Sequence, residues 1–316
     1  MAFFYVFLFG LGFFLILKGG SLLIESSVNF AKKTKIPPMI VGATLVSIAT
    51  TFPETTISII ASSTGAEQLA VNTAIGAMVC NFALVLGVSF LLSPQRVETA
   101  NFVSKWIFFL FSLVLLFAFG IDGAFGVVDS VVLLVVFIGY IIFNLIETKK
   151  GTGLEKSFDD AKSPSWAVVI FQFVISACAV GLGANVLVQN VEEISVILGV
   201  DEGIVGVSVI AVGTNIPELV TTITSARQNN PEIGIGNIFG ASIINCTLLM
   251  SGSALFSPSK NLMVSVLFLV VSIICLVAVT AVISLPILSK NQTSRTQGLL
   301  LLIIYFIYSF MMVKYL

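Results

Sequence analysis

The chain contains no histidine, and charged residues make up only 10% of its 316 positions. Without histidine it lacks the usual zinc ligand and the side chain that most often transfers protons near neutral pH. A soluble globular protein carries about 25% charged residues, whereas this chain is 57% hydrophobic with a mean hydropathy of +1.10. The composition therefore indicates a membrane protein, and a net charge of −1 gives no reason to expect a nucleic-acid partner.

The sequence also shows no Cys-x-x-Cys pair, and its first residues do not have the pattern expected of a cleavable leader. The four cysteines lie in apolar runs and form no Cys-x-x-Cys pair, so we expect them to pack as small apolar side chains. Residues 1–20 have no basic segment and no small-residue cleavage site, and they predict a first transmembrane helix and not a signal peptide. No resident cofactor is expected, and the sequence leaves the oligomeric state open.

Long apolar runs predict ten transmembrane helices, since a spanning helix needs about 20 mostly apolar residues. The predicted spans are 2–25, 38–62, 69–92, 104–120, 126–146, 165–189, 203–226, 233–256, 262–286 and 297–315. With the N-terminus outside, twelve of the fifteen basic residues, Lys105 among them, fall in the odd-numbered connections, and only Lys260 and Lys314 lie opposite. Because basic residues gather in cytoplasmic loops, we expect a multi-pass cell-membrane protein with both termini extracellular.

Two segments of the chain repeat each other. Residues 41–62 and 205–226 align with a constant offset of 164, and the register continues downstream without a gap. Five spans are an odd number, so two similar halves must enter the membrane from opposite sides, which is an inverted architecture of secondary transporters. We predict an all-α fold of two inverted five-helix repeats, arranged as a first repeat at 1–146, a cytoplasmic linker at 147–164 and a second repeat at 165–316.

Each repeat places a glutamate inside an apolar span. Glu54 follows Pro53 in the first repeat, and Glu218 follows Pro217 at the equivalent position of the second. A charged side chain at the bilayer centre costs at least about 2.5–3.5 kcal/mol on insertion scales, so two acids at symmetric positions point to a function. Proline deletes a backbone donor and frees a carbonyl, and a bound cation is a suitable partner for that carbonyl.

Other oxygen-bearing side chains accompany the two acids. They are Thr50, Thr51, Thr214 and Asn215, within one turn of the acids, and the amides Asn81 and Asn245 further along. All are hard oxygen donors, which suit Ca²⁺, Na⁺ or Mg²⁺ and not zinc or copper. Two carboxylates balance one divalent ion, two monovalent ions or two protons. One site that holds either load in turn is what antiport requires.

These motifs resemble the two alpha repeats of the sodium/calcium exchanger family, within the calcium/cation antiporter superfamily, and the compact chain is similar to prokaryotic members. The resemblance implies an antiporter and not an enzyme. It implies that Ca²⁺ and Na⁺ cross the lipid bilayer by alternating access, through movement of the first and sixth helices against the other helices. It further implies direct cation binding by Glu54 and Glu218, with supporting roles for Thr50, Asn81, Thr214, Asn245 and the carbonyls of Ser47 and Ala211.

Several residues depart from the family pattern Gly-Thr-Ser-x-Pro-Glu. The replacements are Ala49, Thr51 and Asn215 in the motif, Ala77 and Ala241 where exchangers often carry serine, and Asn245 where the archaeal prototype has aspartate. Asn215 also creates an Asn-x-x-Glu pattern similar to that of calcium/proton exchangers, so the counter-ion is open between Na⁺ and H⁺. A passive channel is a further alternative, although buried acids suit exchange better than fast conduction. An intramembrane acid–base enzyme is another, but nothing matches an aspartic dyad.

Overall fold

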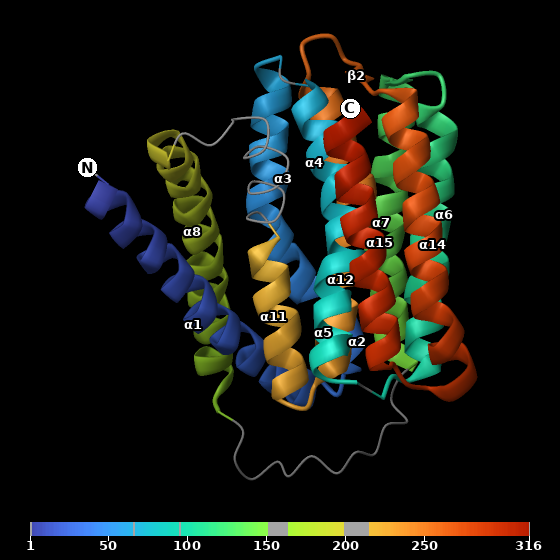
Figure 1. Ribbon diagram of the computed structural model, residues 1–316. Coiled ribbons are helices and arrows are strands. Elements are labelled where there is room, and N and C mark those ends of the chain that lie inside the picture. Colours follow the sequence, from blue (N-terminus) through green and yellow to red (C-terminus); the bar gives the residue numbers. More distant parts are fainter. Residues whose placement is uncertain (1, 66, 95, 151–163, 199–214, 316) are drawn as a thin grey trace.

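The computed structural model describes residues 2–65, 67–94, 96–150, 164–198 and 215–315 as a helical bundle (Figure 1). The strands within these ranges are β1 (Ala124–Phe125) and β2 (Leu262–Met263), which pair antiparallel at one end of the bundle. In the same ranges, nine helical spans are long and apolar enough to cross a membrane. The remaining predicted span, at 203–226, is described only over α11 (Ile216–Arg227). The predicted all-α membrane fold is confirmed.

Three described spans are interrupted by π-helical turns. The interrupted spans are α2 (Pro38–Val41), η1 (Gly42–Val46) and α3 (Ser47–Ser63), then α4 (Glu67–Val79), η2 (Cys80–Val85) and α5 (Leu86–Leu92), then α12 (Pro231–Ile244), η5 (Asn245–Leu249) and α13 (Met250–Phe256). The others are α1 (Ala2–Thr34), α6 (Thr99–Gly120), α7 (Val127–Lys150), α8 (Trp166–Leu198), α14 (Val266–Lys290) and α15 (Arg295–Tyr315). By the repeat offset, η2 and η5 fall at the same register. Single π turns are often found at functional sites.

The two repeats run in opposite directions through the bundle. Glu67, the first residue of α4, accepts hydrogen bonds from Ser257 and Ser259, which follow the end of α13. At the opposite end, the backbone N–H of Glu98, after α5, donates to the carboxylate of Glu232 at the start of α12, at 3.2 Å. The span α4–η2–α5 therefore begins where α12–η5–α13 ends, and the predicted inversion is confirmed.

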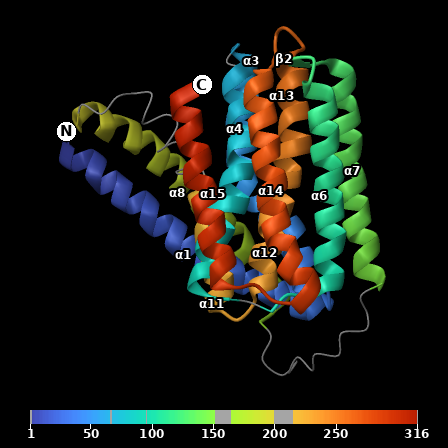
Figure 2. The same ribbon diagram turned by 45° about the vertical axis from the view of Figure 1, so that its right-hand side comes forward.

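The connections sort to two ends of the bundle. Strands β1 and β2 join the α6–α7 connection to the α13–α14 connection at one end (Figure 1, Figure 2). At the other end the N–H of Val97 donates to the carbonyl of Asn291 at 3.0 Å, which joins the α5–α6 and α14–α15 connections. Both chain ends lie toward the β1–β2 end (Figure 1). Which end faces the cytoplasm stays a prediction from the basic residues.

The boundary between the halves is only partly described. Helix α7 continues to Lys150, beyond the predicted end of its span at residue 146. Residues 151–163 lie outside the described part of the chain. The linker at 147–164 and the division of the chain that it implies therefore stay predictions.

Helix α12 forms the centre of the bundle. In its span, 94% of the apolar stretch is buried, compared with 22% for the span of α7. The ring centroid of Phe239 lies 5.0 Å from that of Phe82 and 5.4 Å from that of Phe102, both in edge-on geometry. Such aromatic pairs contribute about 0.5–1.5 kcal/mol beyond their burial. This aromatic cluster joins the second repeat to η2 and α6 of the first.

Helices α1 and α8 pack against each other and lean away from the other helices at one end (Figure 1, Figure 2). The prediction that the first span ends at residue 25 is wrong, because α1 continues to Thr34. The hydroxyls of Ser26 and Ser27 donate to the Leu23 carbonyl, at 3.0 and 2.6 Å, so these polar residues remain part of the helix. With these extra turns α1 has 33 residues, and it runs at an incline to the other helices (Figure 1).

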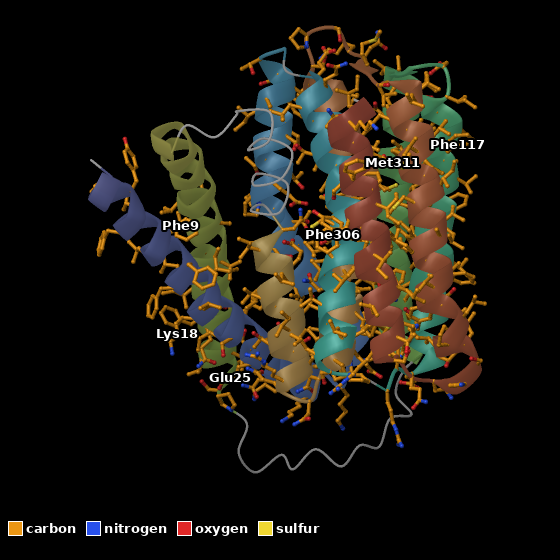
Figure 3. All side chains as sticks on the ribbon, viewed as in Figure 1. Phe9, Lys18, Glu25, Phe117, Phe306 and Met311 are labelled. Atoms are coloured by element: carbon orange, nitrogen blue, oxygen red, sulfur yellow. The ribbon has the colours of Figure 1, made fainter. Side chains whose placement is uncertain are left out.

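The outer surface of the bundle is apolar, as a lipid environment requires. On α15, the side chains of Phe306 and Met311 are 65% and 37% exposed (Figure 3). Lys18, predicted inside the first span, is exposed on α1, and Figure 3 shows it near Glu25 toward the end opposite β1 and β2. A lysine at this depth can extend its ammonium toward the interface while its stem stays among apolar groups.

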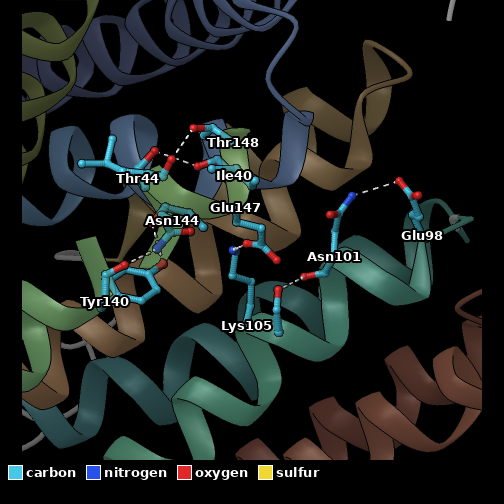
Figure 4. Close-up of polar contacts among 12 residues, drawn as sticks. Ile40, Thr44, Glu98, Asn101, Lys105, Tyr140, Asn144, Glu147 and Thr148 are labelled. Atoms are coloured by element: carbon cyan, nitrogen blue, oxygen red, sulfur yellow. Dashed lines mark hydrogen bonds and ion pairs between the residues drawn. The ribbon is translucent and has the colours of Figure 1, made fainter. Parts of the chain in front are cut away.

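One ion pair is built into the first repeat. The assignment of Lys105 to the third connection is wrong, because Lys105 lies inside α6, as the predicted span 104–120 implies, and is completely buried. Its ammonium pairs with the carboxylate of Glu147 on α7 (Figure 4). On the same helix, Asn144 Nδ2 donates to the carbonyl of Tyr140 at 2.8 Å. The Tyr140 hydroxyl donates to the carbonyl of Ala43 in η1 at 2.6 Å, so α7 supports this π turn.

Candidate cation site

The two repeated glutamates meet in the interior of the bundle. Glu54 lies in the middle of α3 and is 4% exposed, and Glu218 lies in the first turn of α11 and is 0% exposed. The two carboxylates are near enough for each to feel the charge of the other. Like charges repel strongly in a medium of low dielectric constant, so the arrangement calls for cations or protons as partners.

Helix α3 carries Glu54 past a proline. Pro53 has no N–H to donate to the carbonyl of Ala49, one turn earlier, and this frees that carbonyl. The helix continues beyond the proline, and α8 supports it there, since a Cβ at Gly181 would lie 3.1 Å from Pro53 Cγ. The Glu54 carboxylate lies beside the Asn245 side chain of the other repeat, without the geometry of a hydrogen bond.

Helix α11 presents Glu218 at its amino-terminal end. Asn215, which precedes the helix, has φ −95° and ψ 5°, and Pro217 lies in the first turn, where its missing N–H leaves no hydrogen bond unmade. The peptide dipoles give this end of a helix a partial positive charge, which stabilises a nearby carboxylate. Thr50 and Thr51 of the first repeat lie beside the Glu218 carboxylate. Each acid is thus surrounded by groups from the opposite half.

The amides Asn81 and Asn245 lie in the π-helical turns of the two repeats. Asn81 is the second residue of η2, Asn245 is the first of η5, and both are 0% exposed. Neither the oxygen nor the nitrogen of these two amides has a hydrogen-bond partner among the described residues. Each half therefore contributes one buried amide whose oxygen is available as a ligand.

The side-chain oxygens of several buried residues, the two amides included, lack hydrogen-bond partners within the described part of the chain. The residues that carry such side-chain oxygens include Glu54, Glu218, Thr51, Thr55, Asn81, Thr222, Ser242 and Asn245. A buried polar group left without a partner costs about 1–3 kcal/mol. The described ranges contain no cluster of three or more His, Cys, Asp or Glu residues. A cation here would be held by two carboxylates and neutral oxygens, which suits Na⁺ or Ca²⁺.

The other predicted ligands are placed only in part. Ser47 is buried at the start of α3, and its carbonyl accepts from the Thr50 hydroxyl at 3.4 Å. Asn215 is buried directly before α11. Thr214 and Ala211 lie outside the described residues. Direct cation binding by any of the predicted site residues stays a prediction.

Close backbone contact sets the position of the first broken helix. A Cβ at Gly42 would lie 2.1 Å from the carbonyl oxygen of Ile233, and one at Gly240 would lie 2.5 Å from that of Ala43. Because real Cβ atoms do not approach an oxygen so closely, only glycine fits at these two positions. The turn η1 and the start of α3 therefore lie directly against α12, in contact with the second repeat.

The sequence alone does not single out Asn237, which lies fully buried on α12. Its Oδ1 accepts from the Thr50 hydroxyl at 3.2 Å, and its Nδ2 donates to the Thr221 hydroxyl at 3.1 Å, so it joins α3 to α11. Its counterpart by the repeat offset is Thr73, so a comparison of the two copies passes over it. The remaining signal in the sequence is a polar residue within an apolar, glycine-rich stretch.

Inverted repeats with interrupted helices and acids at their meeting point define a secondary transporter of cations. A family model described as sodium/calcium exchanger protein matches residues 4–146 and 168–314. The chain belongs to the sodium/calcium exchanger family. The two matched segments correspond to the two halves that run in opposite directions.

Relatives and solved structures match over nearly the full chain. The sodium/calcium exchanger MaX1 of Methanosarcina acetivorans is 28% identical, with 93% of this chain and 94% of the relative covered. An uncharacterized membrane protein of Methanocaldococcus jannaschii is 29% identical over 95% of both chains. A structure of the sodium–calcium exchanger NCX_Mj superposes with a TM-score of 0.84 at 27% identity, covering 97% of this chain and 98% of that one.

Proposed function

We propose that this protein exchanges Ca²⁺ for Na⁺ across the membrane by alternating access to one interior site. The observation that carries the proposal is the meeting of Glu54 and Glu218, from opposite repeats, in the buried centre of the bundle. Two carboxylates neutralise one Ca²⁺ or two Na⁺, so the same oxygens accept either load in turn. The matching NCX_Mj structures come from protein soaked with Na⁺ and with Sr²⁺ or Ca²⁺, which supports cation chemistry at this fold.

Uptake of ⁴⁵Ca²⁺ into proteoliposomes tests the proposal. We expect uptake when Na⁺ is loaded inside and diluted outside, and no uptake above that of protein-free liposomes when only a pH gradient is imposed. Uptake that follows the pH gradient and ignores Na⁺ would replace the proposal with Ca²⁺/H⁺ exchange. A current that needs no counter-gradient would indicate a channel instead.

The pair α1 and α8 is our candidate for the moving part. A Cβ at Gly183 of α8 would lie 2.8 Å from the carbonyl oxygen of Gly12 on α1, so the two helices are in close backbone contact. Their views in Figure 1 and Figure 2 show them leaning away from the remaining helices together. Tight packing within the pair, and less contact beyond it, supports motion of the two helices as one body.

A disulfide across the boundary tests this motion. A Cβ at Gly20 of α1 would lie 3.8 Å from the Cβ of Val220 on α11, which matches the mean Cβ separation in disulfides of about 3.8 Å. We expect Gly20→Cys with Val220→Cys, in a Cys178→Ser background, to lose Na⁺-driven uptake on oxidation and regain it on reduction. Cys178 is replaced because it is exposed. Undiminished exchange in fully cross-linked protein would show that α1 and α11 do not separate.

A further inference from the structure

We infer that Asn237 is a positioning residue that turns the Thr50 hydroxyl into a ligand for the transported cation. The inference deepens the proposed function and rests on it. Thr50 lies beside the Glu218 carboxylate, and a hydroxyl there can act in two ways. If its single proton points to the carboxylate, the two groups satisfy each other. If the proton points away, the hydroxyl lone pairs join the carboxylate as cation ligands.

A backbone carbonyl fixes the direction of the hydrogen bonds around Asn237. The Thr221 hydroxyl lies 2.8 Å from the carbonyl oxygen of Pro217 and 3.1 Å from that of Glu218. Both carbonyls can only accept, so the Thr221 proton is committed to them. The Thr221 oxygen is then an acceptor for Asn237, whose amide must present Nδ2 to it at 3.1 Å.

The other end of the amide then faces Thr50. Asn237 Oδ1 lies 3.2 Å from the Thr50 hydroxyl and can only accept, so Thr50 is the donor in the hydrogen bond between them. The other nearby acceptor, the Ser47 carbonyl at 3.4 Å, belongs to the same helix as Thr50 and also takes a proton away from Glu218. Thr50 and Glu218 therefore meet as two acceptors. Two acceptors side by side are unfavourable alone and favourable with a cation between them.

Burial keeps this chain of hydrogen bonds in one direction. Thr50 is 2% exposed, and Asn237 and Thr221 are 0% exposed, so solvent cannot supply substitute partners. These hydrogen bonds run from the backbone of α11 through α12 to α3, and they connect the two repeats at the acids. The ligand role of Thr50 in the first repeat thus depends on the backbone of the second.

A structural role is the alternative that a test must separate, because an asparagine in a membrane helix often only holds helices together. The test is a double-mutant cycle that measures the apparent Ca²⁺ affinity of Na⁺-driven ⁴⁵Ca²⁺ uptake. We expect Asn237→Ala to weaken this affinity by about tenfold, the upper end of the range for one neutral hydrogen bond. In a Thr50→Val background, the same substitution should change affinity by less than about twofold, because no hydroxyl remains to be oriented.

Matched variants control for the loss of a buried amide. Asn144→Ala removes another buried asparagine, which bonds to the Tyr140 carbonyl at 2.8 Å on α7, and should leave the affinity unchanged. Thr221→Val removes the hydroxyl that sets the direction of these hydrogen bonds and should weaken Ca²⁺ affinity by about fivefold. Thr221→Ser keeps the hydroxyl and should keep the Ca²⁺ affinity of the unmodified protein. The Thr221 pair carries the test if Asn237→Ala does not fold.

Different results would overturn the inference and the proposed function. An Asn237→Ala effect of equal size with and without the Thr50 hydroxyl would show that Asn237 only joins helices, and the inference would fail. Absence of Na⁺-driven uptake by the unmodified protein would instead overturn the proposed function. Equal affinities in Thr221→Val and Thr221→Ser would also contradict the inference, because the direction of the hydrogen bonds would not depend on the Thr221 hydroxyl.

Discussion

The two copies of the repeated segment hold the same acid in different backbones. Glu54 lies in the middle of α3, which continues past Pro53, whereas Glu218 lies in the first turn of α11. The helix dipole favours a carboxylate at the amino-terminal end of a helix and has little effect at its middle. At Glu54 a side chain from the other half, Asn245, lies beside the acid instead. Equal residues at equal register therefore lie in unequal electrostatic surroundings.

The glycines of the two copies differ in the same way. Gly76 and Gly240 are equivalent by the offset of 164. A Cβ at Gly76 would meet nothing within 4 Å, while one at Gly240 would lie 2.5 Å from both the Ala43 carbonyl oxygen and Ser47 Oγ. The second copy of the helix is the central one, and its glycine makes room for the first broken helix. The second copy reverses the direction of the first through the bundle, and it does not repeat every packing contact of the first.

Neutralising either acid should have the largest effect and test whether the unequal surroundings matter. Glu54→Gln and Glu218→Gln each keep the shape of the side chain and remove one of the two negative charges at the site. We expect each to reduce Na⁺-driven ⁴⁵Ca²⁺ uptake by about a hundredfold or more, because an interior cation loses a charged partner. Near-normal flux in one variant alone would show that the two copies do not form one shared site.

Adding a methyl group at the two glycines should give a smaller and one-sided effect. Gly240→Ala forces a Cβ against the Ala43 carbonyl, and overpacking of this kind costs about 1–3 kcal/mol. Gly76→Ala meets open space and should leave the thermal midpoint of the detergent-purified protein unchanged. Thermal unfolding followed by size-exclusion chromatography measures both variants. Equal loss of stability in the two would contradict the contact assigned to Gly240.

The smallest effect is expected where the copies differ in charge. The ion pair of buried Lys105 with partly exposed Glu147 in the first half corresponds by register to Leu269 and Met311 in the second. Replacing a buried ion pair with apolar residues is often neutral, whereas removing one partner is not. We expect Lys105→Leu with Glu147→Met to unfold within about 1 kcal/mol of the unmodified protein. Glu147→Met alone should be less stable than the double variant, and the reverse order would contradict a buried, paired Lys105.

Much of the architecture follows from patterns within single segments. Apolar runs predict the spans to within a few residues in most cases, and the offset of 164 finds Glu54, Glu218, Asn81 and Asn245. The end of α1 is mispredicted because Ser26 and Ser27 satisfy their hydroxyls within their own helix. Lys105 is mispredicted because its partner, Glu147, comes from another helix. In both cases the sequence shows that the residue is polar, but it does not show which groups its side chain bonds to.

The sequence by itself determined the membrane class, the inverted halves and the paired acids, because hydropathy, residue count and register are properties of the chain read in order. The tertiary structure decided that Asn237 lies between Thr50 and Thr221 and that Gly240, unlike Gly76, admits no side chain. These features depend on atoms from α3, α11 and α12, which are distant in the sequence. Their positions are set by backbone contact across the two halves, and a comparison of one copy with the other does not contain that information.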